Sequence, residues 1–457
     1  MALDAIEVLK ELVRFQSVSA DSAFADGVAA AKDYLVGKLK ELSFEVEEIQ
    51  TPGNPILLGE RRKHPGKPTV VIYGHYDVQP PDPLDEWETE PFEPVIKGDR
   101  IYGRGAADNK GPVAVLLATI SKLLEADADL PLNLVFMFEG EEEIGSPSFP
   151  AVLEAYKERL QGDFLLAIDS GSLQSDQIVV TAGLRGITCL EVKATGPNSD
   201  LHSGVYGGAI LNPLKALIDI CHSLHTEDGR VNVPGFYDAV NAVEDWEREE
   251  LAKLNLKEEN LKAFLNLPDF FRQPDMNPFE ATRFAPTLEY NGFWGGYQGE
   301  GSKTVIPREA SVKISCRLVA NQDPIDIQNK VIETIQERAP SGVKLEFIRD
   351  HSGKPYLVVP PGRPNTPNDQ NPVLAKAFEL TDQLSESEFG KPAAYLREGG
   401  SIPIICDIRD ILGLDSLLIG LYLPEDGMHA PNESFSLEMA EKGQRMLEKL
   451  FLGLAGK

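Results

Sequence analysis

Ionisable side chains follow several apolar segments of the chain, at the points where those segments end. His75 and Asp77 come directly after the apolar run 69–74 (TVVIYG), and Asp169 follows 163–168 (DFLLAI). Imidazole is a common metal ligand, and a carboxylate or carbonyl usually fixes its second nitrogen. In an extended segment Asp77 points the same way as His75 and could orient it. The alternative for this segment is a turn with an exposed histidine and aspartate.

A run of acidic residues is the second feature. It lies in EGEEEIGS, directly after the apolar run 132–138, and its members are Glu139, Glu141, Glu142 and Glu143. Acidic runs are usually solvated, but carboxylates at the end of a buried strand repel one another. A nearby cation would relieve that repulsion.

Two loops that lead into helices add further candidates, Asp108 in IYGRGAADNKGP and His429 in LPEDGMHAPNE. The glycine-rich loop could also cradle a phosphate, but it lacks the spacing of a P-loop. A lone histidine is more often structural. Together with the strand-end residues, however, these side chains supply two imidazoles and several carboxylates without a thiolate, a set that suits zinc or manganese.

The elements that must position these residues are strands separated by helices. Runs 69–74, 132–138 and 163–168 are expected to be buried strands, and a helix is expected to begin near Pro112. This order predicts an α/β fold with a mixed sheet and helices on both faces. Strand ends are where such a sheet usually builds its site.

The pattern changes in the middle of the chain, where a small α+β unit is predicted. Its expected elements are strand 186–194, helix 210–225, strand 286–294, strand 312–319, helix 325–338 and strand 344–350. The order β-α-β-β-α-β indicates a four-stranded sheet with two helices on one face. An insertion at 226–285 is expected to carry a charged helix at 241–266.

The chain then returns to the first unit. A proline-rich linker at 359–372, a strand at 416–421 and a closing helix at 434–452 are expected there. We therefore predict a catalytic domain formed by 1–184 and 363–457, interrupted by a lid and dimerisation domain at 185–362.

Composition excludes several classes of protein. A chain of 457 residues is expected to form two domains. With 72 acidic against 44 basic residues and a net charge of −28, binding to nucleic acid or anionic membranes is not expected. The amphipathic N-terminus does not resemble a signal peptide, and the four cysteines are far apart. We expect a cytoplasmic protein.

Seven motifs, in order from about residue 70 to about 435, resemble the co-catalytic di-zinc exopeptidase family of dipeptidases and aminoacylases. They are GHYDVQP, GRGAADNKGP, EGEEEIGS, the Asp169 strand end, GLRG with DLHSGVYGG, REGGSIP and the His429 loop. HYDVQP, DLHSGVYGG and REGGSIP are most similar to the branch of cytosolic nonspecific and carnosine dipeptidases.

The resemblance implies two divalent metal ions, Zn²⁺ or Mn²⁺. The implied ligands are His75 and Asp169 for one ion, His429 and Glu143 for the other, and Asp108 as the bridge. Glu142 would be the general base that takes the proton of a metal-activated water, and Asp77 would hold the His75 imidazole. The resemblance also implies a cis peptide bond between Asp108 and Asn109, where many relatives have an acidic residue instead of the asparagine.

The substrate contacts implied by the resemblance lie mostly in the small unit. Arg317 would bind the substrate carboxylate, with further contacts from Thr304, His351, Gly400 and Ser401. His202 would stabilise the oxyanion from the partner subunit of a homodimer. An exposed strand arginine and a structural loop histidine are the alternatives for Arg317 and His202.

The predicted reaction is hydrolysis of dipeptides with a free C-terminal carboxylate. An N-acyl-amino-acid amidohydrolase or a carboxypeptidase with the same machinery is the nearest alternative. A peptide-binding or scaffold protein without turnover is the alternative from another class.

Overall fold

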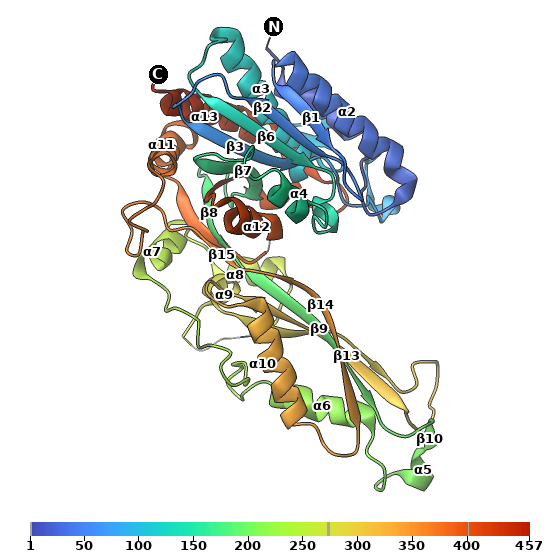
Figure 1. The fold of residues 1–457 in the computed structure, drawn as a ribbon. Helices are drawn as coiled ribbons and strands as arrows, with labels where there is room; N and C mark the ends of the chain where they lie inside the picture. Colours follow the sequence, from blue (N-terminus) through green and yellow to red (C-terminus); the bar gives the residue numbers. More distant parts are fainter. Residues whose placement is uncertain (1, 272–274, 401) are drawn as a thin grey trace.

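Two β-sheets, each with its own hydrophobic core, organise the chain (Figure 1). The computed structural model describes residues 2–271, 275–400 and 402–457. Figure 1 shows the larger sheet and most helices in one layered body, with the smaller sheet extending away from it. No helix in these ranges is both long and apolar enough to cross a membrane.

The larger sheet has the strand order β1-β2-β6-β3-β7-β17-β8-β15, and β16 also pairs with β8. The bounds are β1 (Glu45–Ile49), β2 (Ile56–Arg61), β3 (Thr69–His75), β6 (Asn133–Glu139), β7 (Phe164–Gly171), β8 (Val179–Leu184), β15 (Tyr356–Leu357), β16 (Ala394–Glu398) and β17 (Ser416–Tyr422). Strand β3 runs parallel to β6 and β7, and β17 runs parallel to β7. These central strands are apolar along their length because both faces are covered.

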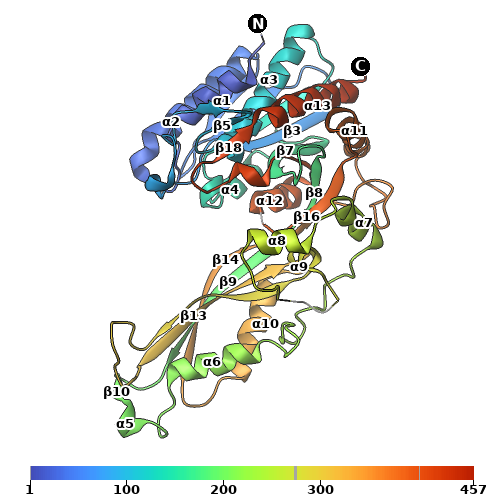
Figure 2. The same cartoon turned by 180° about the vertical axis from the view of Figure 1, so that it is seen from behind.

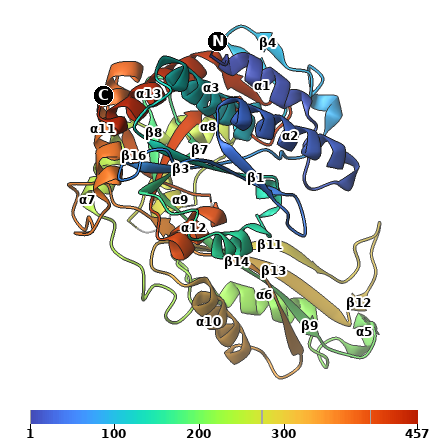
Figure 3. The same cartoon turned by 45° about the horizontal axis from the view of Figure 1, so that its top comes forward.

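Helices cover both faces of the larger sheet, as predicted. Helices α1 (Ala5–Arg14), α3 (Gly111–Ala126) and α13 (Leu437–Ala455) pack together on one face, and α4 (Phe149–Ala155) packs with α12 (Pro403–Leu412) on the other (Figure 3). The remaining helices of this body are α2 (Ala25–Glu41) and α11 (Pro372–Phe389). Helix α3 begins near Pro112 as predicted and is buried on nearly all sides.

The smaller sheet has the order β11-β13-β9-β14 and is antiparallel throughout. Its strands are β9 (Gly186–Thr195), β11 (Thr287–Gly295), β13 (Glu309–Leu318) and β14 (Lys344–Gly353). Helices α6 (Pro213–Ser223) and α10 (Pro324–Glu337) cover one face, as Figure 2 shows from behind. Residues of β9 alternate between buried and half-buried, so only one face carries a core. The predicted four-stranded sheet with two helices on one face is confirmed.

Short elements complete the fold. At the far end of the smaller sheet, β10 (Leu201–His202) pairs with β12 (Val305–Ile306) beside α5 (Ser203–Tyr206). Strands β4 (Val95–Lys97), β5 (Arg100–Tyr102) and β18 (Ser434–Ser436) form a small antiparallel sheet. Helix α9 (Pro278–Phe284) precedes β11.

Two predicted helices differ from the structure. The single helix expected at 241–266 is wrong, because α7 (Asp245–Lys253) and α8 (Glu258–Phe264) are separate helices. Asn255 between them adopts a left-handed backbone with φ 48°, which ends the helical path. The closing helix begins at Leu437, not at 434, because 434–436 pairs with β5 and Ser436 caps the helix. The predicted domain boundaries stay a prediction.

Candidate metal centre

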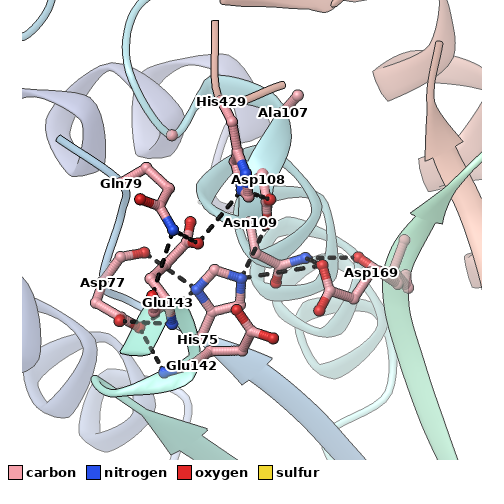
Figure 4. A network of polar contacts seen from close by, with 12 residues as sticks. His75, Asp77, Gln79, Ala107, Asp108, Asn109, Glu142, Glu143, Asp169 and His429 are labelled. Carbon is pink, nitrogen blue, oxygen red and sulfur yellow. Dashed lines mark hydrogen bonds and ion pairs between the residues drawn. The ribbon is translucent and has the colours of Figure 1, made fainter. Parts of the chain in front are cut away.

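Five of the predicted site residues come from the carboxyl-end edge of the larger sheet and from the loops beside it. His75 ends β3, Glu143 lies in the turn after β6, and Asp169 lies in β7. Asp108 precedes α3, and His429 lies in the loop after β17. Because β3, β6, β7 and β17 run parallel, their carboxyl ends meet at one edge, and Figure 4 shows these side chains converging there.

Asp108 lies between two imidazoles. Its Oδ1 is 3.0 Å from Nε2 of His75, and its Oδ2 is 3.0 Å from Nε2 of His429. Oδ1 of Asp169 lies 3.9 Å from the His75 Nε2, and Oε2 of Glu143 lies 3.3 Å from the His429 Nε2. The structure thus forms two groups of three potential ligands that share Asp108, and in each the ligand atoms lie within 4.8 Å of one another.

Asp77 connects His75 to the acidic turn. Nδ1 of His75 lies 3.0 Å from the Asp77 carbonyl oxygen and 3.4 Å from its Oδ1. The same carboxylate accepts hydrogen bonds from the backbone N–H groups of Glu142 at 3.3 Å and Glu143 at 3.1 Å. Asp77 therefore leaves Nε2 of His75 facing Asp108 and fixes the turn that carries the two glutamates.

The charges of this cluster favour a cation. Burial, with the charges of Asp108 and Glu143, raises the pKa of Asp169 to about 7. Burial and the neighbouring carboxylates raise the pKa of Glu142 well above its ordinary value, against the influence of His75. Within the part of the chain that the structure describes, the buried Oε1 of Glu143 has no hydrogen-bond partner. Nitrogen and oxygen donors without a thiolate fit zinc or manganese, so the residues present fit a pair of divalent ions.

The peptide bond between Asp108 and Asn109 is cis, as the resemblance implied. The side-chain amide of Asn109 donates to Oδ1 of Asp169 at 2.9 Å and to the carbonyl oxygen of Ile168 at 2.8 Å. The asparagine therefore has a clear partner in the centre, although it departs from the acidic residue of many relatives.

A cavity of about 510 Å³ opens over the cluster. Its lining includes Asp108, Glu142, Asp169, His429 and Gly400, and also Glu398 and Tyr422. Glu398 and Tyr422 were not predicted from the sequence. Gln79 was not predicted either, and its side-chain amide donates to Oε2 of Glu143 at 2.8 Å. Glu398 lies in the motif REGGSIP and Gln79 lies in the motif GHYDVQP, so both could have been proposed as site residues from the motifs.

The remaining predicted residues that the structure describes lie apart from the metal cluster. Arg317 is half-buried on β13, and the exposed His351 lies on β14, with its Nε2 3.7 Å from Sγ of Cys189. His202 and Thr304 are exposed beside each other at the far end of the smaller sheet, where the backbone N–H of Ser203 donates to the Thr304 carbonyl at 3.0 Å. Ser401 lies outside the described residues.

A cluster of imidazoles and carboxylates at the strand ends of an α/β sheet is typical of a metal-dependent hydrolase. The chain belongs to Peptidase family M20/M25/M40, which matches residues 71–453. It is accordingly a hydrolase of the metallopeptidase class.

Individual relatives cover nearly the whole chain. A Cys-Gly metallodipeptidase of Schizosaccharomyces pombe is 31% identical over 456 residues, which cover 96% of this chain and 93% of the relative. The human Beta-Ala-His dipeptidase is 28% identical over 452 residues, covering 98% and 85%. The solved structure of an M20 family metallo-carboxypeptidase from Sulfolobus solfataricus is 28% identical, covers 99% of this chain and 100% of its own, and has a TM-score of 0.84. The resemblance to the dipeptidase branch is confirmed.

Proposed function

We propose that this protein is a metal-dependent dipeptidase that hydrolyses dipeptides with a free C-terminal carboxylate. The observation that carries the proposal is the position of Asp108, which faces two histidines with its two oxygens and belongs to two of the three groups of potential metal ligands. The names of the Cys-Gly and Beta-Ala-His relatives support the substrate class.

In the proposed centre, His75 and Asp169 would hold one divalent ion, Glu143 and His429 would hold the other, and Asp108 would be a ligand shared by the two groups. Zn²⁺ or Mn²⁺ bound there would supply Lewis acidity and lower the pKa of a water. Glu142, whose carboxyl lines the cavity and has a raised pKa, takes the proton of the attacking water and passes it to the leaving amine. Asp77 keeps His75 oriented throughout.

Substrate recognition is proposed to come from the smaller sheet and the loop after β16. The Arg317 guanidinium binds the C-terminal carboxylate as a fork. His351, Gly400 and Ser401 complete that subsite, and Gly400 already lines the cavity. For Arg317 to act, the unit formed by residues 185–362 serves as a lid over the catalytic domain.

We also propose that the protein is a homodimer whose smaller sheets form the contact. His202 ends β10, which Figure 1 shows at the end of the smaller sheet away from the larger sheet, and Thr304 lies beside it in the chain segment before β12. A partner subunit can bring these two residues over the cavity, where the His202 imidazole would donate to the oxyanion of the tetrahedral intermediate. A cytoplasmic location stays a prediction.

The proposal is tested by removing metal, restoring Zn²⁺ or Mn²⁺, and measuring product release from dipeptides, tripeptides and N-acetyl amino acids. Metal-dependent cleavage confined to dipeptides is the expected result. A wild-type protein that binds two ions per chain but cleaves no dipeptide contradicts the assignment.

One observation favours the alternative of an N-acyl or longer substrate. An apolar groove of about 560 Å³ lies beside the cavity and shares Leu173 and Pro424 with it. Leu254, Leu261 and Phe264 line its other side, and Phe264 is 83% exposed. An apolar acyl group could extend from the cavity into this groove. Faster turnover of N-acyl amino acids with longer acyl chains, lost in Leu261→Asp, would favour this substrate class over dipeptides.

A further inference from the structure

The buried carboxylate of Glu433 holds the loop that carries Asp108. The exposed fraction of Glu433 is 1%. Oε1 accepts from the backbone N–H groups of Ala107 at 2.9 Å and Asp108 at 3.1 Å. Oε2 accepts from the N–H of Gly105 at 2.8 Å and from Nη1 of Arg104 at 2.7 Å. Both oxygens are therefore used to fix one short segment of backbone.

Arg104 extends this network to two other segments that carry potential ligands. Its Nη2 donates to the carbonyl oxygen of His429 at 3.3 Å and to that of Pro80, in the segment after His75, at 3.1 Å. Its guanidinium lies 5.5 Å from the centre of the Trp87 ring. Only a planar fork such as guanidinium can reach these carbonyls and the Glu433 carboxylate at once.

His429 depends on such support more than an ordinary loop residue does. Its backbone is left-handed, with φ 63°, a conformation that is unfavourable for a residue with a Cβ atom. The contact from Arg104 to its carbonyl oxygen helps to hold that conformation. The five-residue segment from His429 to Glu433 is thus connected to the Asp108 loop at both ends. Arg104 makes the connection at His429, and the Glu433 carboxylate makes the other directly.

We propose that Glu433 and Arg104 are positioning residues, which hold Asp108 and His429 at the separation that binding of a shared pair of ions requires. This inference rests on the proposed metal centre. Outer partners of this kind commonly change metal affinity 10–100-fold, because they orient the groups that contact the ion.

A role in folding alone is the competing explanation, and the chain contains a matched control for it. Glu250 is also 1% exposed, accepts from Nη2 of Arg363 at 2.6 Å and accepts from the backbone N–H of Tyr395 at 3.2 Å. Its partners lie on α7, on β16 and in the segment after β15, and none of them is a proposed metal ligand. Glu250→Gln therefore disrupts the same kind of ion pair without touching a proposed ligand.

The experiment compares Glu433→Gln and Glu250→Gln. Metal-free protein is titrated with Mn²⁺ by calorimetry and by electron paramagnetic resonance, and its stability is measured by urea unfolding. We expect both variants to lose stability, but only Glu433→Gln to bind Mn²⁺ about 10–100-fold more weakly. Mn²⁺ affinity of Glu433→Gln within about twofold of wild type would overturn the inference.

Arg104→Lys provides the second variant, and it decides the question where Glu433→Gln does not fold. It keeps the charge but removes the fork, so the contact with the His429 carbonyl is lost first. We expect the ion held by His429 to be weakened more than the ion held by His75 and Asp169. Equal weakening of both ions, or none, would count against positioning. Failure of the proposed centre itself is distinct, because then wild-type protein would bind no Mn²⁺ pair.

Discussion

The side-chain amide of Asn109 donates a hydrogen bond of 2.9 Å to Oδ1 of Asp169. The amide also donates to the carbonyl oxygen of Ile168, so its position is fixed by two acceptors on β7. A carboxylate in place of the amide could not donate to Asp169. Asn109 therefore supports one side of the proposed centre, the side formed by His75 and Asp169.

Replacing Asn109 by leucine should weaken metal binding on that side. Asn109→Leu keeps the branched shape of the side chain but removes both donors, and we expect about a tenfold or greater loss of Mn²⁺ affinity for one of two ions. The two acceptors left without a partner should also cost about 1–3 kcal/mol of unfolding free energy. Asn133→Leu is the control, because the buried Asn133 amide donates to His64 at 2.8 Å, away from the cluster. Unchanged metal affinity in Asn109→Leu would refute the role.

Substitutions of Glu142 and of its neighbour Glu141 should have clearly different effects on kcat. Glu142→Gln removes the proposed base, so kcat should fall about 10²–10⁴-fold while two ions per chain remain bound. Glu141 instead accepts from the backbone N–H of Asn54 at 3.0 Å, so Glu141→Gln should lower stability but largely keep kcat. Steady-state kinetics and metal analysis of both variants provide the check. Similar kcat values in the two variants would remove Glu142 from the mechanism.

Local patterns in the sequence predicted much of the fold and of the cluster. A strand covered on both faces reads as a continuous apolar run, so β3 and β6 were predicted within one residue of their bounds, and β7 was predicted three residues too short at its carboxyl end. The ionisable residues that end those runs had to lie at one sheet edge once the strands were parallel. His75, Asp108, Asp169 and His429 are brought together there.

Features that depend on distant contacts could not be predicted. Nothing local distinguishes Glu433 from any acidic loop residue, since its partners lie more than 300 positions away in the chain. The break between α7 and α8 depends on a single left-handed residue, Asn255, inside an otherwise helical pattern. The position of His202 could not be predicted either. The residue lies in β10, at the end of the smaller sheet away from the larger one, and the motif DLHSGVYGG does not show how far that sheet extends.

Metal binding should release protons, because the metal-free centre holds them. Hydrogen bonds to Asp108 and Glu143 raise the pKa of His429 to about 10, so its imidazole is protonated at neutral pH. A ligating histidine must be neutral, so affinity should fall about tenfold per unit as pH decreases below about 10. Because the pKa of Asp169 is raised to about 7, chiefly by burial, a second proton should steepen this dependence below about pH 7.

Calorimetric titration of the metal-free protein near pH 8 measures the number of protons that metal binding releases. The apparent binding enthalpy should differ between HEPES and Tris by the difference in their ionisation enthalpies, multiplied by at least one proton, because hydrogen bonds to Asp108 and Asp77 also raise the pKa of His75 against the effect of burial. His429→Ala should abolish that difference for one ion. Equal enthalpies in the two buffers for wild-type protein would mean that His429 is already neutral or does not bind the ion.

The proposed donation of His202 across a dimer makes a quantitative prediction about mixed dimers. Neither His202→Ala nor Glu142→Gln should be active alone, because each homodimer lacks one essential group at both sites. After the two variants are unfolded, mixed in equal amounts and refolded, half of the dimers carry one chain of each kind, and one of their two sites has both groups. The mixture should regain about a quarter of wild-type activity. A donor acting within its own chain predicts no recovery, since neither kind of chain then carries both residues.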